Sequence, residues 1–238
     1  MTLATQRLDN FIAKYCKISK GDVRLMLAQK RVKVDGELAL GVDQRINKFT
    51  SIELDNKTIQ DNQAHYVMLH KPVGVVCATK DDKHKTVIDL LPFDFKHELH
   101  IVGRLDLNTS GLVLLTNDSR WSEAITQPVQ KIEKTYQVTL QNPLNESYVE
   151  GFWRGIYFSY EDITTLPAKL SITSENTAEV KLVEGKYHQI KRMFGHFRNP
   201  VMALHRSQVG DITLDANLSV GDSRILSQQE INSVEKLI

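Results

Sequence analysis

A polar stretch at residues 55–65, DNKTIQDNQAH, divides the chain into two parts with different hydrophobic patterns. The part before it combines helical spacing with strand alternation, whereas the part after it is rich in strand-like apolar runs. Because the stretch has no strong periodicity, we interpret it as a linker between domains. At 238 residues the chain is long enough for two compact domains. We therefore expect a first domain at residues 1–60, which includes linker residues, and a second at residues 61–238.

Two short helices are predicted at the start of the chain. In residues 7–12, RLDNFI, the apolar side chains recur at helical spacing and indicate one buried face. Ser19, followed three residues later by Asp22, is a plausible N-cap of a second helix. The apolar stripe that follows predicts that this helix continues to about Lys30.

A β-hairpin is expected next. Residues 31–34, RVKV, alternate with period two, and Asp35-Gly36 is a strong tight-turn signal before residues 37–39. This order of two helices and a hairpin, in the sequence RLDNFIAKYCKISKGDVRLMLAQKRVKVDGELA, resembles the S4 domain over about residues 5–50. The resemblance implies a small RNA-binding module.

Positive charge is concentrated in this first part. The whole chain has a net charge of only +1, but residues 1–60 hold 11 Lys and Arg against 7 Asp and Glu (+4), which leaves 19 against 22 (−3) for the remainder. Charge placement matters more than its sum for nucleic-acid binding. Six basic side chains can line one face and contact RNA phosphates, namely Lys17, Lys20, Arg24, Lys30, Arg31 and Lys33. The alternative is a solvated basic face on an ordinary helix pair.

The second part begins near Tyr66 and mixes strands with helices. Strand-like runs lie at residues 73–78, 112–116, 135–140, 169–173 and 178–183. Helical candidates lie at residues 121–126 and 189–197. We therefore expect a mixed α and β domain.

One carboxylate stands in a polar loop directly before a buried strand. Residues 103–118, GRLDLNTSGLVLLTND, run from the loop that contains Asp106 into the apolar residues 112–115. A loop on a firm scaffold suits a reactive acid that must be placed accurately and remain accessible. Without further context, an Asp in a turn is more often a structural cap or turn former.

Four ordered motifs resemble those of the pseudouridine synthases of the RsuA group. They are KPVG at residues 71–74, the segment at residues 103–118, EKTY at residues 133–136 and EGKYHQIKRMF at residues 184–194. With the S4-like start, the resemblance covers nearly the whole chain. It implies an α+β fold, in which a small N-terminal S4-like RNA-binding domain precedes a catalytic domain built on a mixed, largely antiparallel β-sheet with flanking helices.

The resemblance also assigns site residues. Asp106 matches the essential catalytic aspartate, Tyr136 an aromatic residue that packs on the target base, and Lys191 a basic residue that pairs with the carboxylate. Taken alone, a strand tyrosine such as Tyr136 more often has only a core or edge packing role. A basic helix start that binds phosphate is the alternative for Lys191. Further RNA contacts are expected from three basic residues: Arg104, Lys186 and Arg192. The alternative for Arg104 is that it only braces the loop of Asp106.

The family reaction breaks the bond between uracil N1 and ribose C1′, turns the base, and joins C5 to C1′. The resemblance implies that no cofactor is needed. Asp106 could attack C1′ as a nucleophile or remove a proton from C2′, and the sequence leaves both routes open. No second catalytic carboxylate is evident, although glycoside hydrolysis would usually need a pair. Cys16 and Cys77 stand in no metal-binding spacing, so no metal site is expected.

The C-terminal run at residues 184–215 is most similar to family members that modify uridine 516 of 16S ribosomal RNA. Its YHQIK segment, residues 187–191, differs from the Asn-Arg-Gln pattern of relatives that act on the large subunit. The expected partner is therefore 16S ribosomal RNA, either free or in a small-subunit assembly intermediate. The alternatives are a related synthase that acts on 23S ribosomal RNA and a noncatalytic assembly factor. A zinc nucleobase deaminase is disfavoured, because its His-x-Glu and Pro-Cys-x-x-Cys motifs are absent.

The sequence also predicts a location. No apolar run approaches the roughly 20 residues needed to span a bilayer, and the opening MTLATQRLDNF lacks the basic and apolar regions of a signal peptide. We therefore expect a cytoplasmic protein without a membrane partner, and we expect it to be a monomer.

Overall fold

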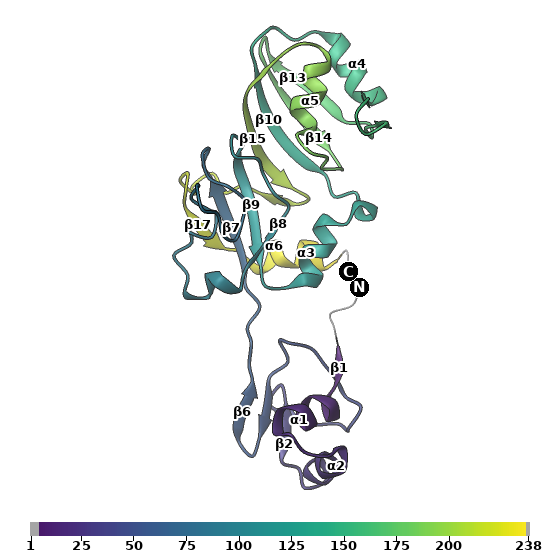
Figure 1. The fold of residues 1–238 in the computed structure, drawn as a ribbon, viewed down its shortest axis with the longest axis vertical. Coiled ribbons are helices and arrows are strands. Elements are labelled where there is room, and N and C mark those ends of the chain that lie inside the picture. The colour runs from purple at the N-terminus through teal and green to yellow at the C-terminus, as the bar shows by residue number, and fades with distance from the viewer. Residues whose placement is uncertain (1–4, 237–238) are drawn as a thin grey trace. The chain divides into compact units, whose positions relative to one another are not determined.

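The computed structural model describes residues 5–236, and the chain divides into two compact units between Ala64 and His65 (Figure 1). This boundary lies within the polar stretch expected to be a linker. However, strand β6 (Lys57–Gln60) pairs antiparallel with β5 (Ile52–Leu54), so the linker interpretation is wrong for residues 57–60. Strand β6 lies at the edge of its sheet and exposes polar side chains, which explains its weak hydrophobic pattern.

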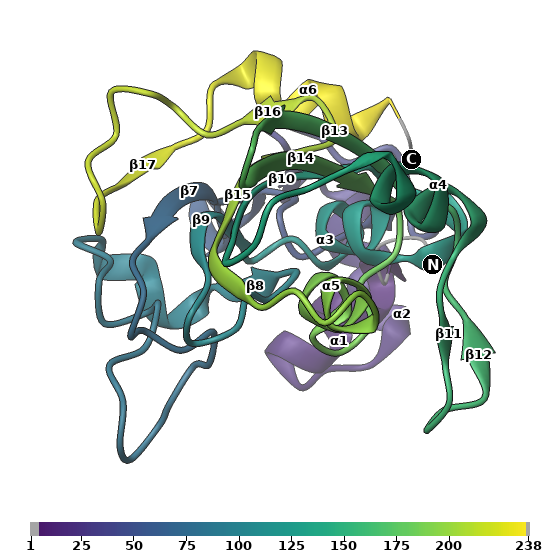
Figure 2. The same cartoon turned by 90° about the horizontal axis from the view of Figure 1, so that it is seen from above.

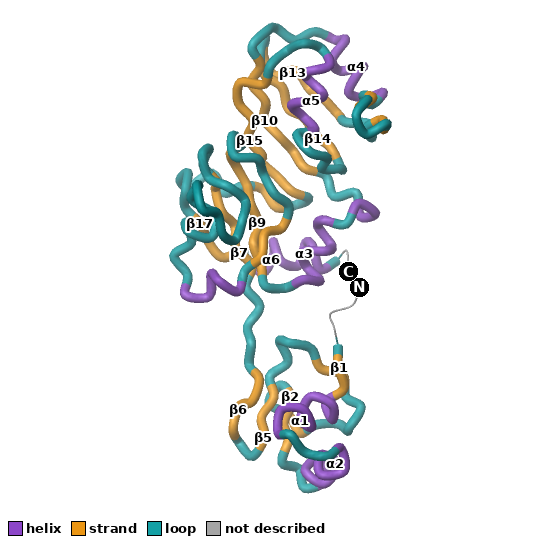
Figure 3. The backbone as a smooth tube through the Cα atoms, in the orientation of Figure 1, coloured by secondary structure: helices purple, strands orange, loops and turns teal. Residues whose placement is uncertain are grey.

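The N-terminal unit contains two helices and short strands (Figure 3). Besides β5 and β6 it comprises β1 (Gln6–Arg7), α1 (Leu8–Cys16), α2 (Lys20–Ala28), β2 (Val32–Val34), β3 (Glu37–Leu38) and β4 (Arg45–Ile46). The predicted helices and hairpin are confirmed. The predicted cap is also confirmed, because Ser19 Oγ accepts a hydrogen bond from the Asp22 backbone N–H and the Asp22 carboxylate accepts one from the Ser19 N–H.

The C-terminal unit contains the larger sheet and its covering helices. Its strands are β7 (Tyr66–Lys71), β8 (His100–Val102), β9 (Ser110–Thr116), β10 (Lys134–Leu140), β11 (Tyr157–Phe158), β12 (Ile163–Thr164), β13 (Lys169–Ser174), β14 (Thr177–Leu182), β15 (Val201–Val209), β16 (Ile212–Thr213) and β17 (Ser223–Ile225). Its helices are α3 (Ser119–Thr126), α4 (Glu146–Arg154), α5 (Gln189–His196) and α6 (Gln228–Glu235), with short 3-10 turns at Asp94–Glu98 and Pro128–Gln130. Within residues 5–236, no helix has the length and apolar character needed to cross a bilayer.

The main sheet is two half-sheets joined at one seam. The first half-sheet contains β7, β8, β9 and β17, and the second contains β10, β13, β14, β15 and β16. At the seam β9 and β15 run parallel, through the pairs Ser110–His205 and Gly111–Arg206. The other strand pairs described in this sheet are antiparallel, which confirms a mixed, largely antiparallel sheet.

Residues 112–115 of strand β9 are all apolar because both faces of the strand are covered. Leu112 and Leu114 belong to one core cluster with Trp121 of α3, whereas Val113 and Leu115 belong to the other. Helices α4 and α5 cover the second half-sheet (Figures 1 and 2). The seam is therefore fixed between two cores, and the loop that enters β9 begins from a rigid base.

The sequence patterns misplaced one strand and missed several others, of which β15 is the longest. Residues 73–78 form no strand, because Gly74, two residues after Pro72, turns the chain with a φ of 85°, and only an isolated bridge joins Val76 to Thr86. Strand β15 was not predicted, although it lies at the centre of the sheet. Its sequence, VMALHRSQV, shows no continuous apolar pattern, because only Leu204, Arg206 and Val209 of this strand are buried.

Gly111 provides a test of the seam. It has a φ of 112°, and a Cβ atom at this position would lie 2.2 Å from the Arg206 carbonyl oxygen. We predict that Gly111→Ala lowers the free energy of unfolding by more than about 3 kcal/mol, because the partner atom is backbone of the adjacent strand. Urea denaturation measures this change. As a control, Gly195→Ala in α5 meets no atom within 4 Å and should stabilise the protein by about 0.5–1 kcal/mol. Equal stabilities for the two variants would contradict the tight seam.

Candidate active site

Asp106 lies in the loop of residues 103–109, which leads into β9 at the seam. The loop closes on itself, because the Thr109 N–H donates to the Asp106 carbonyl at 3.1 Å. It is also held to the turn after β7, because the Gly74 N–H donates to the Leu107 carbonyl at 2.9 Å. The position of Asp106 therefore follows from backbone hydrogen bonds.

The ammonium group of Lys71 fixes this loop from beneath. Lys71 ends β7 and is fully buried, and its Nζ lies 2.7 Å from the carbonyl oxygen of Thr109 and 3.1 Å from that of Asp106. The carbonyl oxygens of Pro72 and Leu107 lie at 3.0 and 3.4 Å, so four acceptors share three ammonium protons. Burial lowers the pKa of Lys71, while the charge of Asp106 acts in the opposite direction. The buried charge is thus compensated by the loop that it supports.

Two further side chains hold the same loop at its start. Buried Arg206 of β15 donates through Nη2 to the Gly103 carbonyl and through Nε to the Leu112 carbonyl, both at 2.9 Å. The Leu105 N–H donates to Cys77 Sγ at 3.3 Å. Burial raises the pKa of the Cys77 thiol, which fits an acceptor in an apolar surrounding rather than a reactive thiolate.

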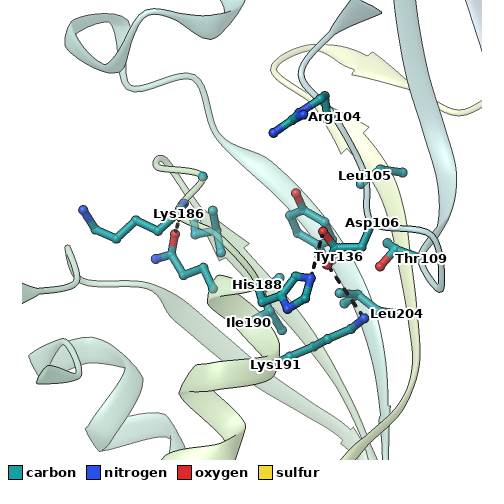
Figure 4. Close-up of a pocket in the computed structure, with 13 residues that line it drawn as sticks. Arg104, Leu105, Asp106, Thr109, Tyr136, Lys186, His188, Ile190, Lys191 and Leu204 are labelled. Atoms are coloured by element: carbon teal, nitrogen blue, oxygen red, sulfur yellow. Dashed lines mark hydrogen bonds and ion pairs between the residues drawn. The ribbon is translucent and has the colours of Figure 1, made fainter. Parts of the chain in front are cut away.

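Two basic side chains from the start of α5 face the Asp106 carboxylate (Figure 4). Lys191 Nζ lies 3.7 Å from one carboxylate oxygen, and His188 Nε2 lies 3.5 Å from the other. Asp106 keeps 33% of its side-chain surface exposed, so the acid is both paired and accessible. His188 precedes the helix with a φ of 49°, a left-handed conformation uncommon for a residue with a side chain.

Tyr136 lies in the same hollow as the acid. This hollow is lined by Asp106 and Thr109 from the loop, Tyr136 from β10, Leu204 from β15, and the residues that begin α5. Tyr136 is mostly buried, and Leu182, Ile190 and Leu204, which belong to the same core cluster, line the hollow with it. The structure therefore brings together the three predicted residues Asp106, Tyr136 and Lys191 (Figure 4).

The other predicted basic residues near the site differ in their surroundings. Arg104 and Lys186 line the hollow, although Lys186 also pairs with Glu184 at 3.4 Å. Arg192 does not line the hollow. Its guanidinium pairs with Glu161 at 2.5 Å and lies over the Phe158 ring at 3.7 Å. A guanidinium held by a carboxylate is less available to phosphate.

The basic residues of the N-terminal unit also fall into two groups. Arg31 pairs with Asp55 at 2.6 Å, and Lys33 lies 3.5 Å from Glu53. The remaining four are exposed and have no ion pair within residues 5–236: Lys17, Lys20, Arg24 and Lys30.

Sequence reasoning gave no role to three residues that shape the site. Lys71 stands in the KPVG motif and His188 in the YHQIK segment, but neither motif alone shows that its side chain reaches the loop of Asp106. Arg206 lies in the strand that was not predicted. The sequence did contain a signal for Lys71, because this lysine ends an apolar strand. A lysine is buried at such a position only where hydrogen-bond acceptors surround its ammonium group.

Comparison with known proteins identifies the family. The model described as RNA pseudouridylate synthase matches residues 65–196, which include Asp106, Tyr136, His188 and Lys191. The chain belongs to this family.

Relatives of this pseudouridylate synthase match it over almost their whole length. The ribosomal small subunit pseudouridine synthase A of Pseudomonas aeruginosa is 45% identical over 229 residues, which cover 96% of this chain and 100% of that protein. The protein of the same name from Escherichia coli K12 is 40% identical and covers 96% of this chain and 99% of its own length. A crystal structure of a pseudouridylate synthase, 38% identical, superposes with a TM-score of 0.70 over 96% of this chain and 99% of that one.

The support of the loop by Lys71 can be tested through stability. We predict that Lys71→Met lowers the free energy of unfolding of the synthase by about 2–4 kcal/mol, because it leaves buried carbonyl groups without a donor. Urea denaturation followed by circular dichroism measures the loss. Lys169→Met, on an exposed position of β13, is the control and should change the value by less than about 0.5 kcal/mol. Equal stabilities of the two variants would contradict the structural role of the Lys71 ammonium.

Proposed function

We propose that this protein converts uridine 516 of 16S ribosomal RNA into pseudouridine. The observation that carries the activity is the partly exposed Asp106 carboxylate, paired with Lys191 at 3.7 Å in the hollow that contains Tyr136. Small-subunit RNA is favoured because the relatives with 45% and 40% identity are named for that subunit. The choice of uridine 516 rests on the resemblance of residues 184–215 to family members that modify that site.

The reaction is an isomerisation that needs no net exchange with another molecule. The bond between N1 and C1′ breaks, the uracil turns, and a bond between C5 and C1′ forms. C5 loses a proton, and N1 gains one. Asp106 begins this sequence either by attacking C1′ or by taking a proton from C2′, and an accessible carboxylate serves both routes.

The surrounding residues have separate proposed roles. Lys191 orients the carboxylate of Asp106 and balances its charge. The ring of Tyr136 packs on the uracil, which has lost its stacking neighbours in the RNA. His188 forms a second contact with Asp106 and limits the directions in which the carboxylate can turn. Arg104 and Lys186, at the rim of the hollow, are placed to meet RNA phosphates, whereas Arg192 supports this wall through Glu161.

We assign the N-terminal unit as an S4-like domain that binds the ribosomal RNA. Its two helices, its hairpin and its four unpaired basic side chains support this assignment. The surplus of +4 in residues 1–60, against −3 in the remainder, indicates that electrostatic affinity is concentrated there. The proposed setting is the cytoplasm, where a monomer would act on 16S ribosomal RNA or on an assembling small subunit.

The assigned substrate predicts one missing modification. Deletion of the gene should remove pseudouridine from one position of 16S ribosomal RNA, uridine 516, and leave 23S ribosomal RNA unchanged. Chemical mapping of pseudouridine in RNA from cells with and without the gene measures this difference. Complementation with the wild-type gene should restore the modification. Loss of a pseudouridine from 23S ribosomal RNA instead would overturn the substrate assignment but leave the reaction type intact.

The N-terminal unit predicts a change in salt dependence. In a variant with Lys17→Gln, Lys20→Gln and Arg24→Gln, RNA affinity should fall and the slope of log affinity against log salt should flatten by up to about 2–3, since each phosphate contact contributes roughly 0.7–0.9. Filter binding between low and moderate salt measures the slope. The control removes three exposed lysines of the catalytic unit, Lys131, Lys169 and Lys236. If both variants keep the wild-type slope, the basic face of the N-terminal unit is only a solvated surface.

A further inference from the structure

A second hollow adjoins the one that contains Tyr136. It has a volume of about 480 Å³, and it shares Arg104, Asp106, Lys186 and His188 with the first. Val76, Cys77 and Leu107 also line it. Asp106 therefore lies between two hollows. In the proposed function the target uridine occupies only the hollow that contains Tyr136.

An exposed aromatic ring stands in the wall of this second hollow. Tyr187 keeps 73% of its surface exposed, although Gln189 and Ile190, which follow it in the YHQIK segment, are buried. Its ring stacks on the ring of His188, with centroids 3.9 Å apart and an angle of 19° between the planes. His188 in turn contacts Asp106 at 3.5 Å, so the free face of Tyr187 has a fixed relation to the catalytic carboxylate.

The segment that presents Tyr187 is held by hydrogen bonds on both sides. The Lys186 N–H donates to Gln189 Oε1 at 2.9 Å, and Gln189 Nε2 donates to Glu184 at 2.6 Å. Gln189 itself is buried. A large ring on a rigid segment loses little conformational entropy when a planar ligand stacks on it.

The charges around the hollow favour an anionic ligand. Arg104 and Lys186 line it, and Asp106 is its one acidic residue among the residues that the structure describes. Arg104 is exposed, and its side chain has no ion pair or hydrogen bond within residues 5–236. A stacking surface beside unpaired positive charge is the arrangement that binds unpaired nucleotides.

We propose that this second hollow receives the nucleotide that adjoins the target uridine, with its base stacked on Tyr187 and its phosphate at Arg104. The inference rests on the proposed function. When the target uridine of a longer RNA is bound at Asp106, the nucleotides on its 5′ and 3′ sides must lie next to the site. Tyr187 is then a binding residue for the substrate chain and does not touch the reacting atoms. The second hollow then binds an unstacked base next to the target uridine. A free nucleoside has no such neighbour and lacks this contact.

The experiment pairs protein variants with RNA that lacks one base. A ribosomal RNA fragment that the wild type modifies is synthesised intact, without the base on the 5′ side of the target, and without the base on the 3′ side. The proteins are wild type, Tyr187→Ala, Tyr187→Phe and Tyr160→Ala. Tyr160 is 95% exposed and lies outside both hollows, so it is the matched control. The half-saturating RNA concentration and the turnover at saturation are measured for every pair.

The stacking role predicts coupled losses. Tyr187→Ala should raise the half-saturating concentration of intact RNA on the order of tenfold and change turnover by less than about twofold, because stacking serves ground and transition states alike. Removal of one flanking base should have the same effect on the wild type. The two changes together should cost no more than either alone. Tyr187→Phe should recover most of the affinity, and Tyr160→Ala should behave as wild type on all three RNAs.

Two results would overturn the inference. In one, Tyr187→Ala and the missing base have independent, multiplicative effects on both flanks. In the other, Tyr187→Ala lowers turnover and leaves the half-saturating concentration unchanged. Tyr187 would then affect the chemistry through its packing on His188 and would not bind the flanking base. If the wild type modifies a different RNA, the three versions of that RNA are used instead. The substrate assignment would then be wrong, but the stacking role of Tyr187 would still be tested. If it modifies neither such a fragment nor 16S ribosomal RNA in an assembling small subunit, the proposed function and this inference both fail.

Discussion

The ammonium group of Lys71 lies beneath the loop that carries Asp106, and it donates to the carbonyl oxygens that shape this loop. A buried ammonium is stable only where acceptors replace the water it has lost. The loop supplies these acceptors, and in return it is held in one conformation. Arg206 does the same for the Gly103 carbonyl at the start of the loop. Two buried cations therefore position one partly exposed carboxylate, that of Asp106.

The seam between the half-sheets explains why residues distant in sequence meet at this carboxylate. The parallel pair of β9 and β15 joins a half-sheet that carries the Asp106 loop to one that carries Tyr136 and packs against α5. Close approach at Gly111 sets the spacing of the two strands. From α5 come Lys191 and His188, which contact the two carboxylate oxygens. The arrangement combines a fixed backbone, an accessible acid and a nearby aromatic ring, which are the features that positioned acid or nucleophilic catalysis requires.

Local patterns predicted much of this fold, and long-range contacts account for what was missed. The Ser19 cap, the helix at α5 and the apolar strand β9 follow from spacing and capping chemistry. The family motifs predicted that Asp106, Tyr136 and Lys191 would meet, which no local pattern could show. Strand β15 was hidden because its polar residues are satisfied by distant partners, as Arg206 is by the Gly103 carbonyl. His188 was overlooked for the same reason, because its contact with Asp106 depends on how α5 packs.

In the proposed mechanism the activity depends on a charged carboxylate at position 106, and one substitution tests this directly. Asp106→Asn keeps the size of the side chain and the backbone hydrogen bonds of the loop but removes the reactive charge. The measurement is single-turnover formation of pseudouridine in 16S ribosomal RNA at saturating protein, together with RNA affinity. Turnover should be abolished, while affinity should stay within about threefold of wild type, since binding relies on other residues. Substantial turnover by a clean Asp106→Asn preparation would contradict the assignment of Asp106 as the catalytic residue.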